Sequence, residues 1–179
     1  GLTLEAAVRS RLKAGQTIDP ARLAEIQLES ERGTALDKAL HFIAATQKTE
    51  KQIREYLAGK GYLPAVSDYV LQKMSEYGFL DDGQYARRYA EAAVKRKGAR
   101  LIRAELKAKG VSDEHISAAL DGLEGEAETA KKLLSKFLRG KEADRQTLYK
   151  AYRYLIGKGF DGDTAREAVA AFGDTGEEE

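Results

Sequence analysis

The 179-residue sequence contains no cysteine and no tryptophan, and it has only two prolines. The absence of cysteine excludes a disulfide framework, a thiolate metal site and a cysteine nucleophile, and it is compatible with a reducing compartment. So few prolines, together with 42% hydrophobic and 33% charged residues, favour long helices over a loop-rich all-β domain. We therefore expect an all-α globular protein.

Long apolar runs and an excess of one charge are also missing. No segment approaches the roughly 18 apolar residues of a membrane span, and residues 1–12 lack the apolar core of a signal peptide. The sequence thus predicts a soluble, cytoplasmic protein with no membrane partner. Its formal net charge is only +1, from 30 basic and 29 acidic residues. Taken alone, that balance argues against nucleic acid as a partner.

The strongest positive signal is an internal repeat of 49 residues. Lys-Gly pairs stand at 60–61, 109–110 and 158–159, and each is preceded three residues earlier by a leucine. Apolar and aromatic positions match in the same frame on both sides of these pairs: 36/85/134, 40/89/138, 53/102/151, 62/111/160 and 71/120/169. The repeat predicts an elongated tandem array of three three-helix units, each stacking on its neighbour.

The predicted boundaries follow from helix start and stop signals. In the first unit, Thr49 and Gln52 form a capping box and Gly61 ends the same helix. Ser112 and Pro64 begin later helices. Two further helices, Glu5 to Ala14 and Pro20 to about Glu31, are expected before the repeats. The resulting segments are an N-terminal helical segment (1–34), repeat 1 (35–81), repeat 2 (82–126), repeat 3 (127–173) and an acidic tail (174–179).

Catalytic and metal-binding signals are weak. His41 and His115 lie in different repeats and have no partners at a relay or metal-site spacing, so we interpret them as ordinary helix residues. Asp81 and Asp82 resemble a cation site, but adjacent acids before a helical pattern are more typical of a helix N-terminus. The Lys-Gly pairs end helices, whereas a phosphate loop precedes one. The sequence predicts no enzyme, metal or cofactor.

Charge is strongly segregated along the chain. Residues 35–81 sum to zero, whereas 82–109 carry +6, 110–130 carry −6, 131–158 carry +7 and 159–179 carry −6. Such blocks create strong local fields that the total conceals. Arg100, Arg103 and Lys107 fall on one helical face opposite Ile102 and Leu106, which makes that face a candidate phosphate track. The alternative is an ordinary solvated helix face with local ion pairs.

The predicted DNA-binding set extends this face to neighbouring bases and to the third repeat. Beside Lys150 and Arg153, the cluster of Tyr149, Tyr152 and Tyr154 could stack on bases, but packing within the repeat is the favoured interpretation. The full predicted set is Arg87, Arg88, Lys95, Arg96, Lys97, Arg100, Arg103, Lys107, Lys109, Lys150 and Arg153.

The segment Phe79-Leu80-Asp81-Asp82-x-x-Tyr85-Ala86, the basic run after it and the helix end Arg103, Leu106, Lys109, Gly110 resemble the RecX family of bacterial regulators of the RecA recombinase. The resemblance covers about 39–173, and residues 4–19 are similar to the end of a longer N-terminal region in some members. One departure is visible. Where the family usually has Arg-x-Arg-Ser-Glu, this sequence has Gln47-Lys48-Thr49-Glu50, which keeps the cap but weakens a forked arginine contact.

The resemblance implies a non-enzymatic protein that binds the RecA–DNA filament and inhibits its ATPase, recombinase and coprotease activities. It implies partners in RecA and in single- or double-stranded DNA, action as a monomer, and a place in DNA repair, homologous recombination and the SOS response. A second hypothesis is a helical-repeat scaffold that binds protein without DNA affinity. An enzyme is third, disfavoured because no catalytic constellation is present.

Overall fold

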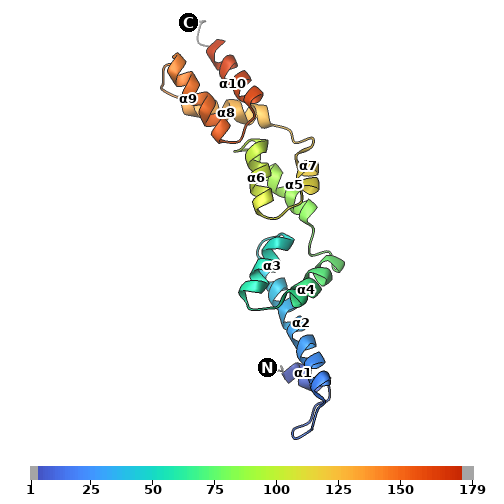
Figure 1. Ribbon diagram of the computed structural model, residues 1–179. Coiled ribbons are helices and arrows are strands. Elements are labelled where there is room, and N and C mark those ends of the chain that lie inside the picture. Colours follow the sequence, from blue (N-terminus) through green and yellow to red (C-terminus); the bar gives the residue numbers. More distant parts are fainter. Residues whose placement is uncertain (1–3, 175–179) are drawn as a thin grey trace. The chain divides into compact units, whose positions relative to one another are not determined.

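The computed structural model describes residues 4–174, and their regular structure is all α-helical, as the composition predicts (Figure 1). The predicted acidic tail falls almost wholly on residues 175–179, outside the described residues. The helices are α1 (Leu4–Arg9), α2 (Pro20–Ala44), α3 (Glu50–Gly59), α4 (Pro64–Glu76), α5 (Asp82–Ala93), α6 (Ala99–Ala108), α7 (Asp113–Leu120), α8 (Glu126–Leu138), α9 (Arg145–Gly157) and α10 (Gly162–Asp174).

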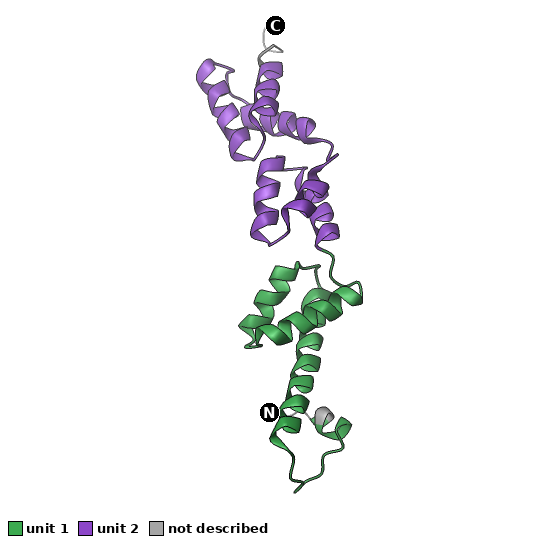
Figure 2. Ribbon diagram, turned by 45° about the vertical axis from the view of Figure 1, so that its right-hand side comes forward, with its two compact units in different colours: residues 1–81 green, residues 82–179 purple. Residues whose placement is uncertain are grey.

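The chain divides into two compact units, residues 1–81 and 82–179 (Figure 2). The first contains α1–α4, and the second contains α5–α10. Repeat 1 consists of the second half of α2 with α3 and α4. Repeats 2 and 3, formed by α5–α7 and α8–α10, both lie in the second unit. Glu126, the last residue of the predicted repeat 2, is the first residue of α8 and is therefore assigned to repeat 3 below.

Each repeat has its own apolar core, built from the matched columns of the sequence. The middle helix supplies two completely buried side chains, and the flanking helices close over them. These pairs are Ile53 and Leu57 in α3, Ile102 and Leu106 in α6, and Ala151 and Leu155 in α9, all 0% exposed. The 49-residue repeat in the sequence therefore corresponds to the same arrangement of buried side chains in all three repeats.

The Lys-Gly pairs end the middle helices in the same way. After α3, the Gly61 amide donates to the Ala58 carbonyl (2.9 Å) and the Tyr62 amide to the Leu57 carbonyl (3.2 Å). This paired pattern needs a left-handed residue at its turn, and Gly61 has φ +86°. The same bonds follow α6 and α9, where Gly110 and Gly159 have φ of +86° and +92°. The predicted helix ends are confirmed.

The predicted helix starts are confirmed where side chains cap them. The Thr49 hydroxyl accepts from the Gln52 amide (3.3 Å), and the Gln52 side chain accepts from the Thr49 amide (3.1 Å). Ser112 accepts from the His115 amide at the start of α7 (3.2 Å). Helix α5 begins at Asp82, so the adjacent acids stand at a helix start, as expected.

The N-terminal helices differ from the prediction. Helix α2 does not end near Glu31 but runs 25 residues through Gly33 into repeat 1. A single glycine costs a helix only about 1 kcal/mol, and the flanking turns keep their hydrogen bonds. Helix α1 ends at Arg9 instead of Ala14, because the chain turns at Arg11, whose φ is +54°. Despite its length, α2 is not apolar enough to cross a membrane, nor is any other described helix.

Candidate nucleic-acid interface

Helix α6 separates its apolar and basic residues cleanly. Ile102 and Leu106 are fully buried, while Arg100, Arg103 and Lys107 are exposed on the other side. These three bases are called the α6 basic face below. Their i, i+3, i+7 spacing places them along about two turns of helix, so their charges lie in one row on the surface.

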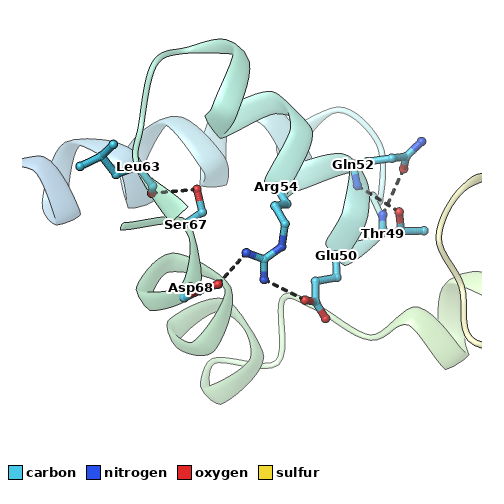
Figure 3. A network of polar contacts seen from close by, with 7 residues as sticks. All are labelled: Thr49, Glu50, Gln52, Arg54, Leu63, Ser67 and Asp68. Carbon is cyan, nitrogen blue, oxygen red and sulfur yellow. Dashed lines mark hydrogen bonds and ion pairs between the residues drawn. The ribbon is translucent and has the colours of Figure 1, made fainter. Parts of the chain in front are cut away.

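Helix α3, the equivalent helix of repeat 1, carries bases at two of these three positions, and there each base has an acidic partner; the position of Lys107 is Ala58. Arg54, which matches Arg103, donates to Asp68 (2.5 Å) and to Glu50 (3.3 Å), and Figure 3 shows its guanidinium between the two carboxylates. The Asp68 hydrogen bond raises the pKa of Arg54 and outweighs the opposing effect of burial. Lys51, which matches Arg100, pairs with Glu55 (3.7 Å). The bases of α3 are therefore largely neutralised.

Repeat 2 lacks all three of these acids. The positions of Glu50, Glu55 and Asp68 are occupied there by neutral residues, namely Ala99, Ala104 and Ser117. Among the residues that the structure describes, Arg103 consequently has a single side-chain contact of this kind, 3.5 Å to the Ser117 hydroxyl. In the described part of the chain, no carboxylate lies within ion-pair distance of Arg100. Arg100 and Arg103 thus lack the acidic counter-charges that accompany Lys51 and Arg54 in α3.

Within the described residues, Lys107 is the one member of the α6 basic face that forms an ion pair. Its ammonium lies 3.2 Å from the nearer oxygen of Asp113 at the start of α7. Both side chains are about two-thirds exposed, at 66% and 69%. Such a pair contributes little stability and is screened by salt. A phosphate can therefore replace Asp113 as the partner of Lys107 at small cost.

The predicted bases around the α5–α6 turn divide into two groups. Lys95 and Arg96 are exposed, as are Arg87 and Arg88 on α5. Lys97 instead folds back onto repeat 2, where its ammonium lies 2.5 Å from the Glu105 carboxylate. The exposed residues remain candidates for phosphate contacts, whereas Lys97 is already engaged within the fold.

Glu105 and Tyr89 form the polar network that holds Lys97. The Tyr89 hydroxyl donates to Glu105 (2.7 Å). Burial, reinforced by this carboxylate, raises the pKa of Tyr89 to about 12. Burial also acts to raise the pKa of Glu105, but the hydrogen bonds from Lys97 and Tyr89 outweigh it and hold that pKa below its ordinary value. Lys109 completes the arrangement with its ammonium 5.4 Å from the centre of the Tyr89 ring.

The predicted bases of repeat 3, Lys150 and Arg153, are exposed on α9. The neighbouring tyrosines separate by role. Tyr154 stacks on Phe137 with ring centres 4.7 Å apart, and Tyr152 packs against the repeat 3 core, which confirms the packing interpretation for these two. Tyr149 is 61% exposed and does not follow that interpretation.

A groove missed by the sequence analysis borders the predicted bases of α5. Its cavity of about 440 Å³ lies between α5 and the α7–α8 connection, with Arg87 and Lys95 on one side and Asp121 and Glu124 on the other. No sequence signal marked it, because it is formed by residues about 30 positions apart. The missing acids of repeat 2, in contrast, were visible in the 49-residue frame once the two repeats were compared position by position.

The histidines and paired acids contribute no metal site within the described residues, where no cluster of three or more metal-ligating side chains occurs. His41 lies on exposed α2 surface with its Nδ1 2.8 Å from the Asp37 carbonyl. His115 is exposed near the start of α7. Both histidines thus lie on exposed helix surface.

The fold and this surface define a class of protein: tandem three-helix domains with an exposed basic helix face. Family models match all three repeats in order, as the first (residues 35–74), second (81–120) and third (124–169) three-helix domains of RecX. The chain belongs to the RecX family of regulatory proteins.

Individual relatives agree with this assignment. The chain is 34% identical to the regulatory protein RecX of Clostridium perfringens, over 85% of this chain and 74% of the relative. It is 31% identical to that of Listeria monocytogenes, over 92% and 64%. A crystal structure of regulatory protein RecX has a TM-score of 0.80 at 25% identity, over 93% of this chain and 87% of the other. RecX from Lactobacillus salivarius shares the fold, with a TM-score of 0.74 at 20% identity, over 79% and 96%.

Proposed function

We propose that this protein negatively regulates RecA by binding the RecA–DNA filament, with the α6 basic face contacting DNA phosphates. The observation that carries the proposal is the loss in repeat 2 of every acid that neutralises the equivalent bases of repeat 1. Local pairing would suffice if these bases served only solubility. In α6, Arg100 and Arg103 have no carboxylate partner among the described residues and Lys107 has an exposed one, so this row of bases suits phosphate binding.

The family assignment and this surface both support a role of the protein at the filament. Binding there inhibits the ATPase, recombinase and coprotease activities of RecA, in the cytoplasm, during DNA repair, homologous recombination and the SOS response. The bases of repeat 3 add DNA contacts through Lys150 and Arg153. The protein acts as a monomer and uses no catalytic group of its own.

The test is ATP hydrolysis by RecA on single-stranded DNA, measured with increasing amounts of this protein. We expect hydrolysis to fall with stoichiometry, and the variant R100Q/R103Q/K107Q to inhibit less at each ratio. An equal loss of charge elsewhere, in the variant R22Q/K38Q/K60Q, serves as the control and should inhibit as the unmodified protein does. No inhibition at any ratio of the unmodified protein to RecA contradicts the proposal.

A protein-binding scaffold without DNA affinity is the second candidate, and exposed aromatic residues favour it. Tyr77 and Phe79, at the end of repeat 1, are 59% and 49% exposed, with ring centres 6.3 Å apart. Exposed aromatic pairs are typical of protein contacts. A salt titration separates the candidates, because phosphate binding weakens steeply with salt and a scaffold has essentially no DNA affinity to lose.

A further inference from the structure

The start of α6 is completed by residues of repeat 3. The first amides of a helix have no partner within the helix, and α3 meets this need with its own Thr49 side chain. The matching residue before α6 is Gly98, which has no side chain to offer. Its amide donates to the Lys158 carbonyl (3.0 Å), and the Arg100 amide donates to the Gly159 carbonyl (3.0 Å).

A side chain of repeat 3 supplies the remaining bond. The Ala99 amide donates to the Glu126 carboxylate at the start of α8 (2.9 Å). Three consecutive amides, that of the N-cap Gly98 and the first two of α6, are therefore satisfied by two segments of repeat 3, one at the start of α8 and one after the end of α9. Because the C-terminal carbonyls of α9 meet the N-terminal amides of α6, the two helix dipoles are also favourably aligned.

Two glycines make this approach geometrically possible. A Cβ atom on Gly98 would overlap the backbone of Gly159 and Phe160, and one on Gly159 would overlap the backbone and Cβ of Leu101. Both overlaps involve backbone or Cβ atoms, which cannot swing aside. By contrast, Gly61 at the equivalent helix end of repeat 1 has nothing within 4 Å of such a Cβ atom. Gly98 and Gly159 are called the glycine joint below.

We propose that the glycine joint and Glu126 are positioning elements that lock repeats 2 and 3 into one DNA-binding body. The α6 basic face is then held at a fixed place relative to Lys150 and Arg153 of α9. Two sites held in this way bind one polynucleotide with less loss of freedom than two sites on a flexible linker. The DNA part of this inference rests on the proposed function, whereas the locking of the repeats does not.

The locking is tested by a distance measurement on the full chain. Because the sequence has no cysteine, spin labels can be attached to A118C in α7 and A170C in α10, both at exposed positions. We expect one narrow distance distribution, and a broad one after Gly98→Ala. The matched control is Gly157→Ala, two residues before Gly159, where an added Cβ atom would have nothing within 4 Å, and this variant should leave the distribution narrow. A broad distribution without substitution, or a narrow one in a folded Gly98→Ala variant, overturns the proposal.

Glu126 gives a second test that does not depend on the folding of the glycine variant. Glu126→Ala and Glu126→Gln remove the same negative charge, but only glutamine keeps an acceptor for the Ala99 amide. We expect the distance distribution to broaden in Glu126→Ala and to stay narrow in Glu126→Gln. Equal distributions in the two variants contradict the positioning role of Glu126.

DNA affinity then decides whether the locking serves binding. Removing the Glu126 charge alone would tighten binding of a polyanion, so Glu126→Gln should bind a single-stranded oligonucleotide at least as well as the unmodified protein. Glu126→Ala and Gly98→Ala should bind it on the order of tenfold more weakly. A broadened distance distribution with unchanged DNA affinity overturns the inference that the two repeats bind one polynucleotide together. No DNA affinity in any protein refutes the proposed function, and the distances still decide the locking.

Discussion

Helices α3 and α6 occupy the same place in successive repeats, yet their surfaces differ in one respect. Both carry bases at the first and second positions of one face, Lys51 and Arg54 in α3 and Arg100 and Arg103 in α6. In repeat 1 these bases are paired with acids on α3 and α4. In repeat 2 the acids are absent. This difference in counter-charge is the basis on which we propose the α6 basic face as the face that contacts DNA.

A second difference lies beneath the surface of the same helices. In α3, Tyr56 stacks on Phe42 with ring centres 4.1 Å apart, and Lys60 covers the tyrosine at 5.5 Å. The matching position in α6 is Glu105, which replaces that stack by a hydrogen-bonded network with Lys97 and Tyr89. Repeat 2 therefore depends on ionisation where repeat 1 depends on aromatic packing, and the two should respond differently to pH.

The largest expected effect is a loss of stability when the apolar core that both repeats share is disrupted. Leu57→Ala and Leu106→Ala each remove a completely buried side chain from an equivalent core. We expect each to lower the free energy of unfolding of its own unit by about 2–5 kcal/mol. Chemical denaturation followed by hydrogen exchange of the two units measures this. A loss in one repeat several times that in the other would show that the cores are not equivalent.

The next effect concerns the α6 basic face itself. R100Q/R103Q/K107Q should raise the dissociation constant for single-stranded DNA by about 100-fold at low salt, because three phosphate contacts are lost. The helix should remain folded, since all three side chains are exposed. Fluorescence anisotropy gives the affinity and circular dichroism the fold. Unchanged affinity in a folded variant would place the DNA site elsewhere.

A smaller effect is expected when repeat 2 is given the acids of repeat 1. In A104E/S117D, carboxylates stand where Glu55 and Asp68 stand in the first repeat, and they can pair with Arg100 and Arg103. We expect DNA affinity to fall about tenfold with little change in stability, because both pairs lie at the surface. The variant A104Q/S117N is the uncharged control of the same shape. A similar loss of DNA affinity in that control would show that the added side chains act by their size instead of their charge.

The reverse change in repeat 1 should have a slight effect. Asp68→Ser frees Arg54 from its shorter contact and leaves Glu50 as its partner. The pair is partly exposed, at 42% and 62%, so we expect less than about 1 kcal/mol of lost stability. DNA affinity should rise about twofold. A large rise in DNA affinity would show that repeat 1 already lies against the DNA and that only its acids prevent its bases from binding phosphates.

The smallest expected effect is a pH dependence confined to repeat 2. Hydrogen bonds hold the pKa of Glu105 below its usual 4.5 in the folded state, so its contribution to stability is present above that value and is lost as the pH falls through the folded pKa. Glu105→Gln should reduce this acid sensitivity of the second unit. Acid titration of thermal stability tests it, and an identical profile in the variant would mean that the Glu105 network does not matter.

Much of the fold could be predicted because local signals and the repeat agree. The capping box at Thr49, the glycine helix ends and the buried leucine columns each follow from one segment of sequence. The continuity of α2 through Gly33 could not, because a glycine suggests a helix end locally but costs a continuing helix only about 1 kcal/mol. The ion pair of Lys97 with Glu105 and the contact of Gly98 with Gly159 could not be predicted either. Both join residues whose proximity depends on how the helices pack.

The sequence predicted which bases form the candidate site, but it did not predict which of those bases have an acidic partner. Arg100, Arg103 and Lys107 follow from helical spacing alone. Their distinction from Lys51 and Arg54 depends on acids on a neighbouring helix, 14 residues away in the case of Asp68. The residue pattern of one helix does not reveal an acidic partner on another helix. Alignment of the repeats on their 49-residue frame does reveal it, because the acids of repeat 1 then stand opposite neutral residues of repeat 2.

The most direct test of the α6 basic face is the salt dependence of DNA binding. The logarithm of the binding constant is measured against the logarithm of salt concentration for the unmodified protein and for R100Q/R103Q/K107Q. Each lost phosphate contact reduces the slope by about 0.7 on single strands and about 0.9 on duplex DNA. If the face binds phosphates, the slope of the variant should be shallower by about two to three. Equal slopes would contradict the assignment.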